Sequence, residues 1–184
     1  MMDELSLNIL DIAQNSVAAE ATLVKIDVEE DDIGDRVVIR VSDNGKGMSD
    51  KFLETVENPF ITTRKTRKIG LGISFLKEAA EITGGCIELQ SELGLGTTIT
   101  AYFTKSHVDR QPLGDLTGTI ITLVTLNPGI DFEIRYVVNE NEFLFSSQDV
   151  KAHLGEDVML NSPPIISFLT DYVKEHIQNL GGTA

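Results

Sequence analysis

The sequence predicts an α+β protein: a two-layer α/β sandwich with helices on one face of a sheet, followed by a small α+β C-terminal extension. Two observations predict this fold. A segment with helical periodicity over 3–20 precedes a strand hairpin over 22–42, and a second helix over 70–83 precedes a second hairpin over 86–104. Because a helix precedes each hairpin, the helices can cover one face of a common sheet.

The first predicted helix has apolar residues at helical spacing, and Glu4 near its start suits the helix dipole. The segment 22–29 alternates apolar and polar residues, which is typical of a half-buried strand. Residues 31–35 are rich in Asp and Gly and predict a turn, so 36–42 is the partner strand of a hairpin.

Residues 49–56 predict a short helix, and 58–69 lacks a clear period, which indicates a mobile loop. The helix over 70–83 has a regular apolar side and ends at a pair of glycines. Strands follow on both sides of a Gly-containing turn, at 86–91 and 97–104.

The rest of the chain carries its own pattern of short strands and helices. We predict strands over 119–126, 132–138 and 142–146, and helices over 147–154 and 165–180. The expected organisation is therefore a first domain over 1–107 and a small α+β unit over 112–184 that can dock a partner.

Composition narrows the class of protein. The chain has 184 residues and a net charge of -14, which argues against nucleic acid as a partner and is compatible with a basic protein partner. We expect no membrane span and no signal peptide. The single cysteine, Cys86, fits a reducing cytoplasm, and its β-like surroundings predict a buried thiol.

The stretch Asp43–Met48 follows an apolar, β-branched run that predicts a buried strand. A carboxylate at the end of a strand can accept a hydrogen bond from an exocyclic amine such as N6 of adenine. Gly45 and Gly47 let the backbone approach a flat base. The alternative is an ordinary Asp-Asn-Gly turn.

Asp11 and Asn15 lie four residues apart and share one face of the first helix. An amide oxygen can ligate Mg²⁺, and a carboxylate one turn earlier can orient or deprotonate a nucleophile. The alternative is an exposed polar helix face. A basic cluster over 64–68 can neutralise phosphate charge or form a solvated loop.

Five segments in this order resemble the motifs of the GHKL superfamily of ATPases, which includes gyrase-, Hsp90- and MutL-type ATPases and histidine kinases. The segments that resemble the N, G1, F, G2 and G3 boxes are, in turn, Asn15-Ser16 with Asp11, then 43–48, 58–65, 70–73 and 94–98. The resemblance implies a Bergerat ATP-binding fold with a mixed sheet, and ATP and Mg²⁺ as cofactors.

The resemblance also implies roles for single residues. Asn15 would hold Mg²⁺, Asp43 would bind the adenine amine and Asp11 would be the catalytic carboxylate. The other nucleotide-binding residues that it implies are Gly45, Gly47, Phe60, Thr63, Lys65, Gly70, Leu71, Gly72 and Thr97.

One departure from the family pattern bears on activity. ATP-hydrolysing members usually have Glu where this chain has Asp11, which is shorter by one methylene group. Because a misplacement of about 1 Å can lower a rate on the order of 10²-fold, we expect slow hydrolysis.

The function expected from these observations is a stand-alone Mg-ATP-binding regulatory protein of the histidine-kinase-like type. It would act on a protein partner in signal transduction by phosphotransfer or slow ATP hydrolysis, as a protein kinase or an ATPase. The alternative is a non-enzymatic ATP/ADP-gated protein-interaction module, in which nucleotide orders residues 58–69. A third hypothesis is a binding domain with a degenerate site.

Overall fold

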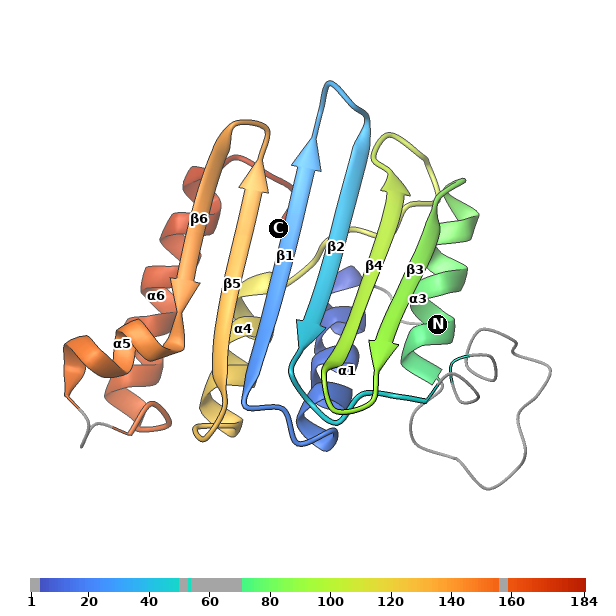
Figure 1. The fold of residues 1–184 in the computed structure, drawn as a ribbon. Coiled ribbons are helices and arrows are strands. Elements are labelled where there is room, and N and C mark those ends of the chain that lie inside the picture. The colour runs from blue at the N-terminus through green and yellow to red at the C-terminus, as the bar shows by residue number, and fades with distance from the viewer. Residues whose placement is uncertain (1–3, 50–52, 54–70, 156–158) are drawn as a thin grey trace.

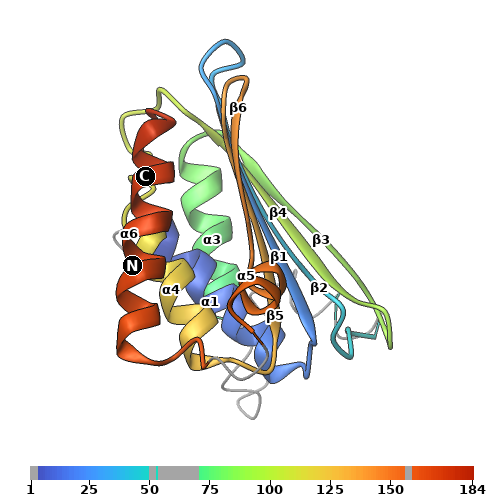
Figure 2. The ribbon, with the colours of Figure 1, turned by 90° about the vertical axis from the view of Figure 1, so that its left-hand side faces the viewer.

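The computed structural model describes residues 4–49, 53, 71–155 and 159–184. These residues form one sheet with helices packed on one of its faces (Figure 1, Figure 2). The strands are β1 (Leu23–Asp31), β2 (Arg36–Asp43), β3 (Cys86–Glu92), β4 (Gly96–Thr104), β5 (Asp131–Val138) and β6 (Asn141–Ser146). The helices are α1 (Leu5–Ala18), α3 (Leu71–Ile82), α4 (Leu116–Leu126), α5 (Ser147–Leu154) and α6 (Pro163–Asn179).

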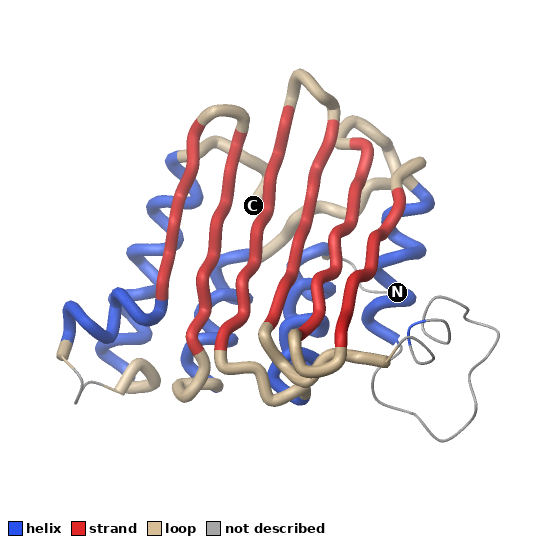
Figure 3. Tube along the Cα trace, viewed as in Figure 1, coloured by secondary structure: helices blue, strands red, loops and turns tan. Residues whose placement is uncertain are grey.

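The sheet is mixed and six-stranded, with the order β3-β4-β2-β1-β5-β6. β1 and β5 run parallel, and the other neighbouring pairs run antiparallel. Figure 3 shows the strands side by side with the helices behind them. The predicted α+β fold and its two-layer sandwich are therefore confirmed.

The core lies between the sheet and the helices. Val24, Ile26 and Val28 of β1 are buried, while the residues between them are not, as the period of two requires. Across the sheet, Ile26 pairs with Val41 and so extends the apolar layer to β2. Burying a side chain of this size stabilises the fold by about 1.5–3 kcal/mol.

The prediction of a strand over 119–126 was wrong, because these residues belong to α4. The run is rich in Thr, Ile and Val, which favour strands, and is too apolar throughout for its period to distinguish helix from strand. The Asp115 side chain caps the helix by accepting a 2.7 Å hydrogen bond from the Gly118 N–H. Ile120, Leu123 and Val124 are buried where α4 packs between α1 and α6.

Two further predictions have different outcomes. Cys86 is exposed, not buried, because β3 is an edge strand and Cys86 lies on its exposed side. The helix predicted over 49–56 and the loop predicted over 58–69 lie outside the described residues, except for Ser49 and Leu53.

The C-terminal extension contains both helices and strands, and its strands continue the sheet. β5 pairs with β1 along its whole length, so that Phe132 lies beside Val24 in one core. The division of the chain into units over 1–107 and 112–184 stays a prediction; the structure adds that the two share a sheet. Among the described residues, no helix is long and apolar enough to span a bilayer.

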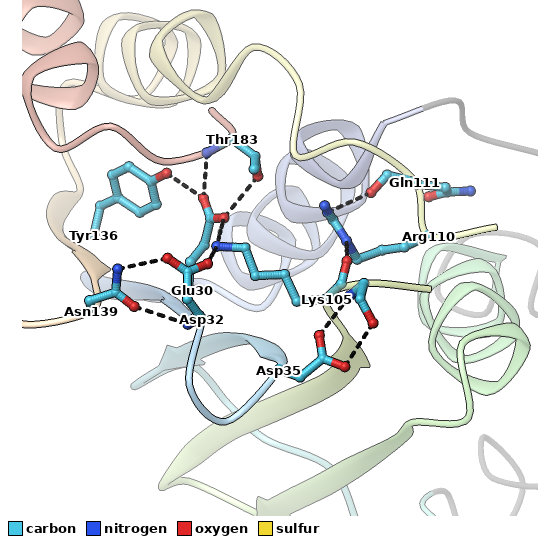
Figure 4. A network of polar contacts seen from close by, with 10 residues as sticks. Glu30, Asp32, Asp35, Lys105, Arg110, Gln111, Tyr136, Asn139 and Thr183 are labelled. Atoms are coloured by element: carbon cyan, nitrogen blue, oxygen red, sulfur yellow. Dashed lines mark hydrogen bonds and ion pairs between the residues drawn. The ribbon is translucent and has the colours of Figure 1, made fainter. Parts of the chain in front are cut away.

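A buried carboxylate joins the two parts at the end of β1 (Figure 4). Glu30 is fully buried and accepts hydrogen bonds from the Tyr136 hydroxyl at 2.5 Å and from the Thr183 N–H at 2.7 Å. The Lys105 ammonium lies 2.9 Å from the same carboxylate and 2.7 Å from that of Asp32. Burial raises the pKa of Glu30, but the hydrogen bonds from its neighbours outweigh this and hold the pKa below its ordinary value.

Candidate functional site

A cavity of about 370 Å³ lies between α1 and the sheet, where β2 ends and β4 begins. Its walls are largely apolar, and a few polar groups converge on it. The lining residues are Ile12, Asn15, Ser16 and Ala18 of α1, Ala19 just after it, Val41, Asp43, Thr97 and Ile99 of the sheet, Lys46, Gly47, Met48 and Ser49 of the loop after β2, and Ile73 of α3. A concave apolar pocket with convergent polar groups is typical of a small-molecule site.

The Asp43 carboxylate is held in place from two sides. The Ser16 hydroxyl donates to Oδ2 at 2.6 Å, and the Gly45 N–H donates to Oδ1 at 2.8 Å. Each carboxylate oxygen has further acceptor capacity, so the group can still receive a hydrogen bond from a ligand. The sequence analysis included Ser16 in the segment that resembles the N box but assigned it no role; the available signal was its place one turn after Ile12, on the face of α1 that meets the core.

The loop after Asp43 is packed against its surroundings. The Asn44 Oδ1 atom accepts from the N–H groups of Thr22 and Leu23, at 2.9 and 3.0 Å. Gly47 has φ +62°, and a Cβ there would overlap the carbonyl of Glu92. The glycine is therefore required by its left-handed backbone and by its close approach to the β3–β4 hairpin.

Asp11 and Asn15 share a face of α1, as predicted, but they lie differently with respect to the cavity. Asn15 lines it. Asp11 is not among the lining residues; its carboxylate lies against the start of α3, where a Cβ on Gly72 would overlap it. The absence of a side chain at Gly72 thus allows α1 and α3 to approach each other around a carboxylate.

The structure brings Asn15, Asp43, Gly47 and Thr97 together around the cavity, with Gly45 beside them. Leu71 is the first residue of α3, next to Gly72. The predicted site residues Phe60, Thr63, Lys65 and Gly70 lie outside the described residues. Glu4 contacts the extension by accepting a hydrogen bond from the Asp115 N–H, and Asn8 donates to Gln111, just before the extension.

The residues present fit an adenine nucleotide. Ile12, Val41, Ile73 and Ile99 provide apolar walls for a flat ring, and the fixed carboxylate of Asp43 provides an acceptor for an amine. The Asn15 side chain can supply one oxygen ligand to Mg²⁺, which commonly takes its others from phosphates and water. The described residues contain no group of three or more His, Cys, Asp or Glu side chains placed to hold a metal.

Residues 1–107 match the family described as histidine kinase-, DNA gyrase B-, and HSP90-like ATPase. The chain belongs to this family. Membership supports the binding of ATP or ADP, which is the common property of these GHKL ATPase domains.

Known members and a solved structure show how far the likeness extends. Sporulation kinase D of Bacillus subtilis is 31% identical over 98 residues, which is 53% of this chain and 19% of that kinase. Sensor histidine kinase ZraS of Salmonella typhimurium is 35% identical over 101 residues, which is 54% of this chain and 22% of that kinase. The match thus covers about a fifth of each kinase.

The fold of this GHKL protein is similar to that of the Aquifex aeolicus MutL ATPase domain, whose structure was solved in complex with ADP. The TM-score is 0.52 at 16% sequence identity, over 84% of this chain and 68% of the MutL chain. At this identity the likeness establishes the fold alone.

Proposed function

We propose that this GHKL protein is a Mg-ATP-binding regulatory protein that acts on a protein partner by phosphotransfer or slow ATP hydrolysis. The observation that carries the proposal is the Asp43 carboxylate, which Ser16 and Gly45 orient at the edge of an apolar cavity. A carboxylate so placed can accept a hydrogen bond from an amino group on a flat ring, such as N6 of adenine, and membership of an ATPase family favours adenine over other bases that carry an amino group.

Each residue that the motif resemblance singles out has a role in this proposal. Asp43 accepts a hydrogen bond from the adenine amine, and Asn15 ligates Mg²⁺. Bound Mg²⁺ supplies neutralisation of phosphate charge. Backbone N–H groups of Gly70, Leu71 and Gly72 at the start of α3 hold phosphate oxygens, as a helix N-terminus favours anions. The remaining proposed contacts are Phe60 and Thr63 beside the nucleotide and Lys65 on the phosphates.

Binding of ADP to wild-type protein and to Asp43→Asn, measured by titration calorimetry, tests the site. The substitution replaces a charged acceptor by a neutral amide, and a hydrogen bond to a charged group is worth roughly 1.5–3 kcal/mol. We therefore expect the dissociation constant to rise about 10- to 100-fold. Asp171→Asn, an equal change of charge at an exposed position of α6, is the matched control and should leave it unchanged. Equal ADP affinity in wild type and Asp43→Asn contradicts the assignment.

One observation favours the alternative of a non-enzymatic, ATP/ADP-gated interaction module. Asp11 is shorter by one methylene group than the Glu that is usual in ATP-hydrolysing members, so although its carboxylate lies against Gly72, beside the proposed phosphate contacts, it is less able to reach a nucleophile there. An enzyme requires this side chain to act near the γ-phosphate, whereas a sensor does not.

Turnover measurements separate the two functions. If the protein is an enzyme, purified protein with Mg-ATP releases phosphate or labels its partner, and Asp11→Asn abolishes this while it retains ATP binding. If it is a module, neither product forms, and capture of the partner differs between ATP- and ADP-loaded protein. The net charge of -14 favours a basic partner surface.

A further inference from the structure

Three polar side chains form a row across three neighbouring strands beside the cavity. Ser91 of β3 is paired with Thr97 of β4, and Thr97 is paired with Asp43 of β2. Cross-strand partners share a face of the sheet, so all three side chains point toward the helices. Asp43 and Thr97 line the cavity, and Ser91 lies behind Thr97.

The Ser91 hydroxyl has three hydrogen-bonding neighbours. It accepts from the Met48 N–H at 2.8 Å, and it lies 2.9 Å from the Gly96 carbonyl oxygen and 2.8 Å from the Thr97 hydroxyl oxygen. A serine hydroxyl has one proton and two acceptor positions. The Gly96 carbonyl can only accept, so its contact with Ser91 is a hydrogen bond only when Ser91 donates its single proton to it.

The direction of the Thr97 hydroxyl follows from this count. When Ser91 donates to Gly96, Thr97 donates to Ser91, and all three contacts are hydrogen bonds. When Ser91 donates to Thr97 instead, the Gly96 carbonyl oxygen lies against a Ser91 oxygen that has no proton left to donate to it. The first arrangement satisfies more polar groups, and unpaired polar groups away from water are costly. In this first arrangement the Thr97 hydroxyl can act toward a ligand only as a hydrogen-bond acceptor.

We propose that Ser91 is a positioning residue that sets the base specificity of the cavity by taking the Thr97 proton. The row then presents acceptors alone: the Asp43 carboxylate and the Thr97 oxygen. An exocyclic amino group has two N–H donors for such a surface; a 6-oxopurine can still donate through its N1–H, but its keto oxygen finds no donor there. The cavity therefore selects 6-aminopurine nucleotides over 6-oxopurine nucleotides, an inference that rests on the proposed nucleotide site.

The test compares dissociation constants for ADP and for inosine diphosphate, which carries a keto oxygen in place of the amine. In Ser91→Ala the Thr97 proton is free to turn toward the keto oxygen, and the preference for ADP falls by about tenfold, the equivalent of one hydrogen bond. Ser91→Thr keeps a hydroxyl and retains the wild-type preference. A purely structural role, through loss of the Met48 contact, weakens both ligands alike and leaves the ratio unchanged.

A double-mutant cycle shows whether Ser91 acts through Thr97. In a Thr97→Val background, Ser91→Ala has no effect on the ratio if the inference holds. An unchanged ratio in Ser91→Ala alone, or an equal change in both backgrounds, overturns it. Ser91→Cys, with its weakly bonding thiol, is the second variant if Ser91→Ala does not fold, and it should lower the ratio in the same direction.

The same titrations separate this inference from the proposed function. If wild type does not bind ADP, or if Asp43→Asn binds it equally well, the nucleotide site itself is wrong. If ADP binding depends on Asp43 while the ratio is independent of Ser91, only the role of Ser91 is wrong.

Discussion

Replacing Lys105 by Met should destabilise the fold, because it leaves the buried Glu30 carboxylate without its cation. Glu30 is fully buried, and the Lys105 side chain is 15% exposed with its ammonium 2.9 Å from the carboxylate. Methionine preserves much of the apolar stem and removes the charge. The carboxylate keeps its hydrogen bonds from Tyr136 and Thr183 and loses its ion pair.

The size of the effect follows from burial. Removing one partner of a buried ion pair costs roughly 3–5 kcal/mol. Because Lys105 retains some contact with water and Glu30 keeps other donors, we expect a cost at or just below the lower end of this range, about 2–3 kcal/mol. In a chain of this size, each kcal/mol shifts the melting temperature by roughly 2–4 °C. The expected decrease is therefore about 4–12 °C.

Thermal unfolding followed by circular dichroism at neutral pH measures this decrease. The matched control is Lys25→Met, which removes the same charge from an exposed pair: Lys25 lies 2.6 Å from Glu133, and the two side chains are 51% and 45% exposed. Exposed ion pairs contribute little to stability, so the control should have the same melting temperature as the wild type. The double variant Lys105→Met/Glu30→Gln should recover part of the loss. Equal melting temperatures for Lys105→Met and Lys25→Met would refute the reasoning.

Three further predictions concern the pH dependence of stability and glycine substitutions. Because the pKa of Glu30 is lowered in the folded state, its carboxylate stabilises the fold above its ordinary pKa, and this stabilisation is lost as pH falls through the folded pKa. Urea titrations from pH 7 to about 3 should therefore show that the free energy of unfolding decreases less for Glu30→Gln than for wild type. Alanine is favoured over glycine in a helix by about 0.5–1 kcal/mol, but a Cβ at position 72 overlaps the Asp11 carboxylate. Gly72→Ala should therefore raise the free energy of unfolding by this amount only in an Asp11→Ala background. An equal change in both backgrounds contradicts that contact. Gly47→Ala should lower the melting temperature more than Gly94→Ala. Both glycines have positive φ, but a Cβ on Gly47 overlaps the Glu92 carbonyl, whereas a Cβ on Gly94 meets nothing within 4 Å. Equal decreases in melting temperature would mean that backbone strain alone matters.

Much of the candidate site could be predicted from local sequence. Asn15, Asp43 and Thr97 lie far apart along the chain, and the structure brings all three to one cavity. The roles of Ser16 and Ser91 could not be predicted in this way, although Ser16 lies in the segment that resembles the N box. Their importance comes from hydrogen bonds to Asp43 and Thr97, and such contacts exist only once a helix and three strands are assembled.

Most helices and strands and the turns between them could be predicted from local sequence, because they depend on periodicity and on local backbone chemistry. The helix over 119–126 depends instead on tertiary contacts, because the cap at Asp115 and packing between α1 and α6 outweigh β propensity. The tertiary structure also decided that β5 runs parallel to β1 and that Glu30 meets Thr183, since pairing between distant segments leaves no local pattern.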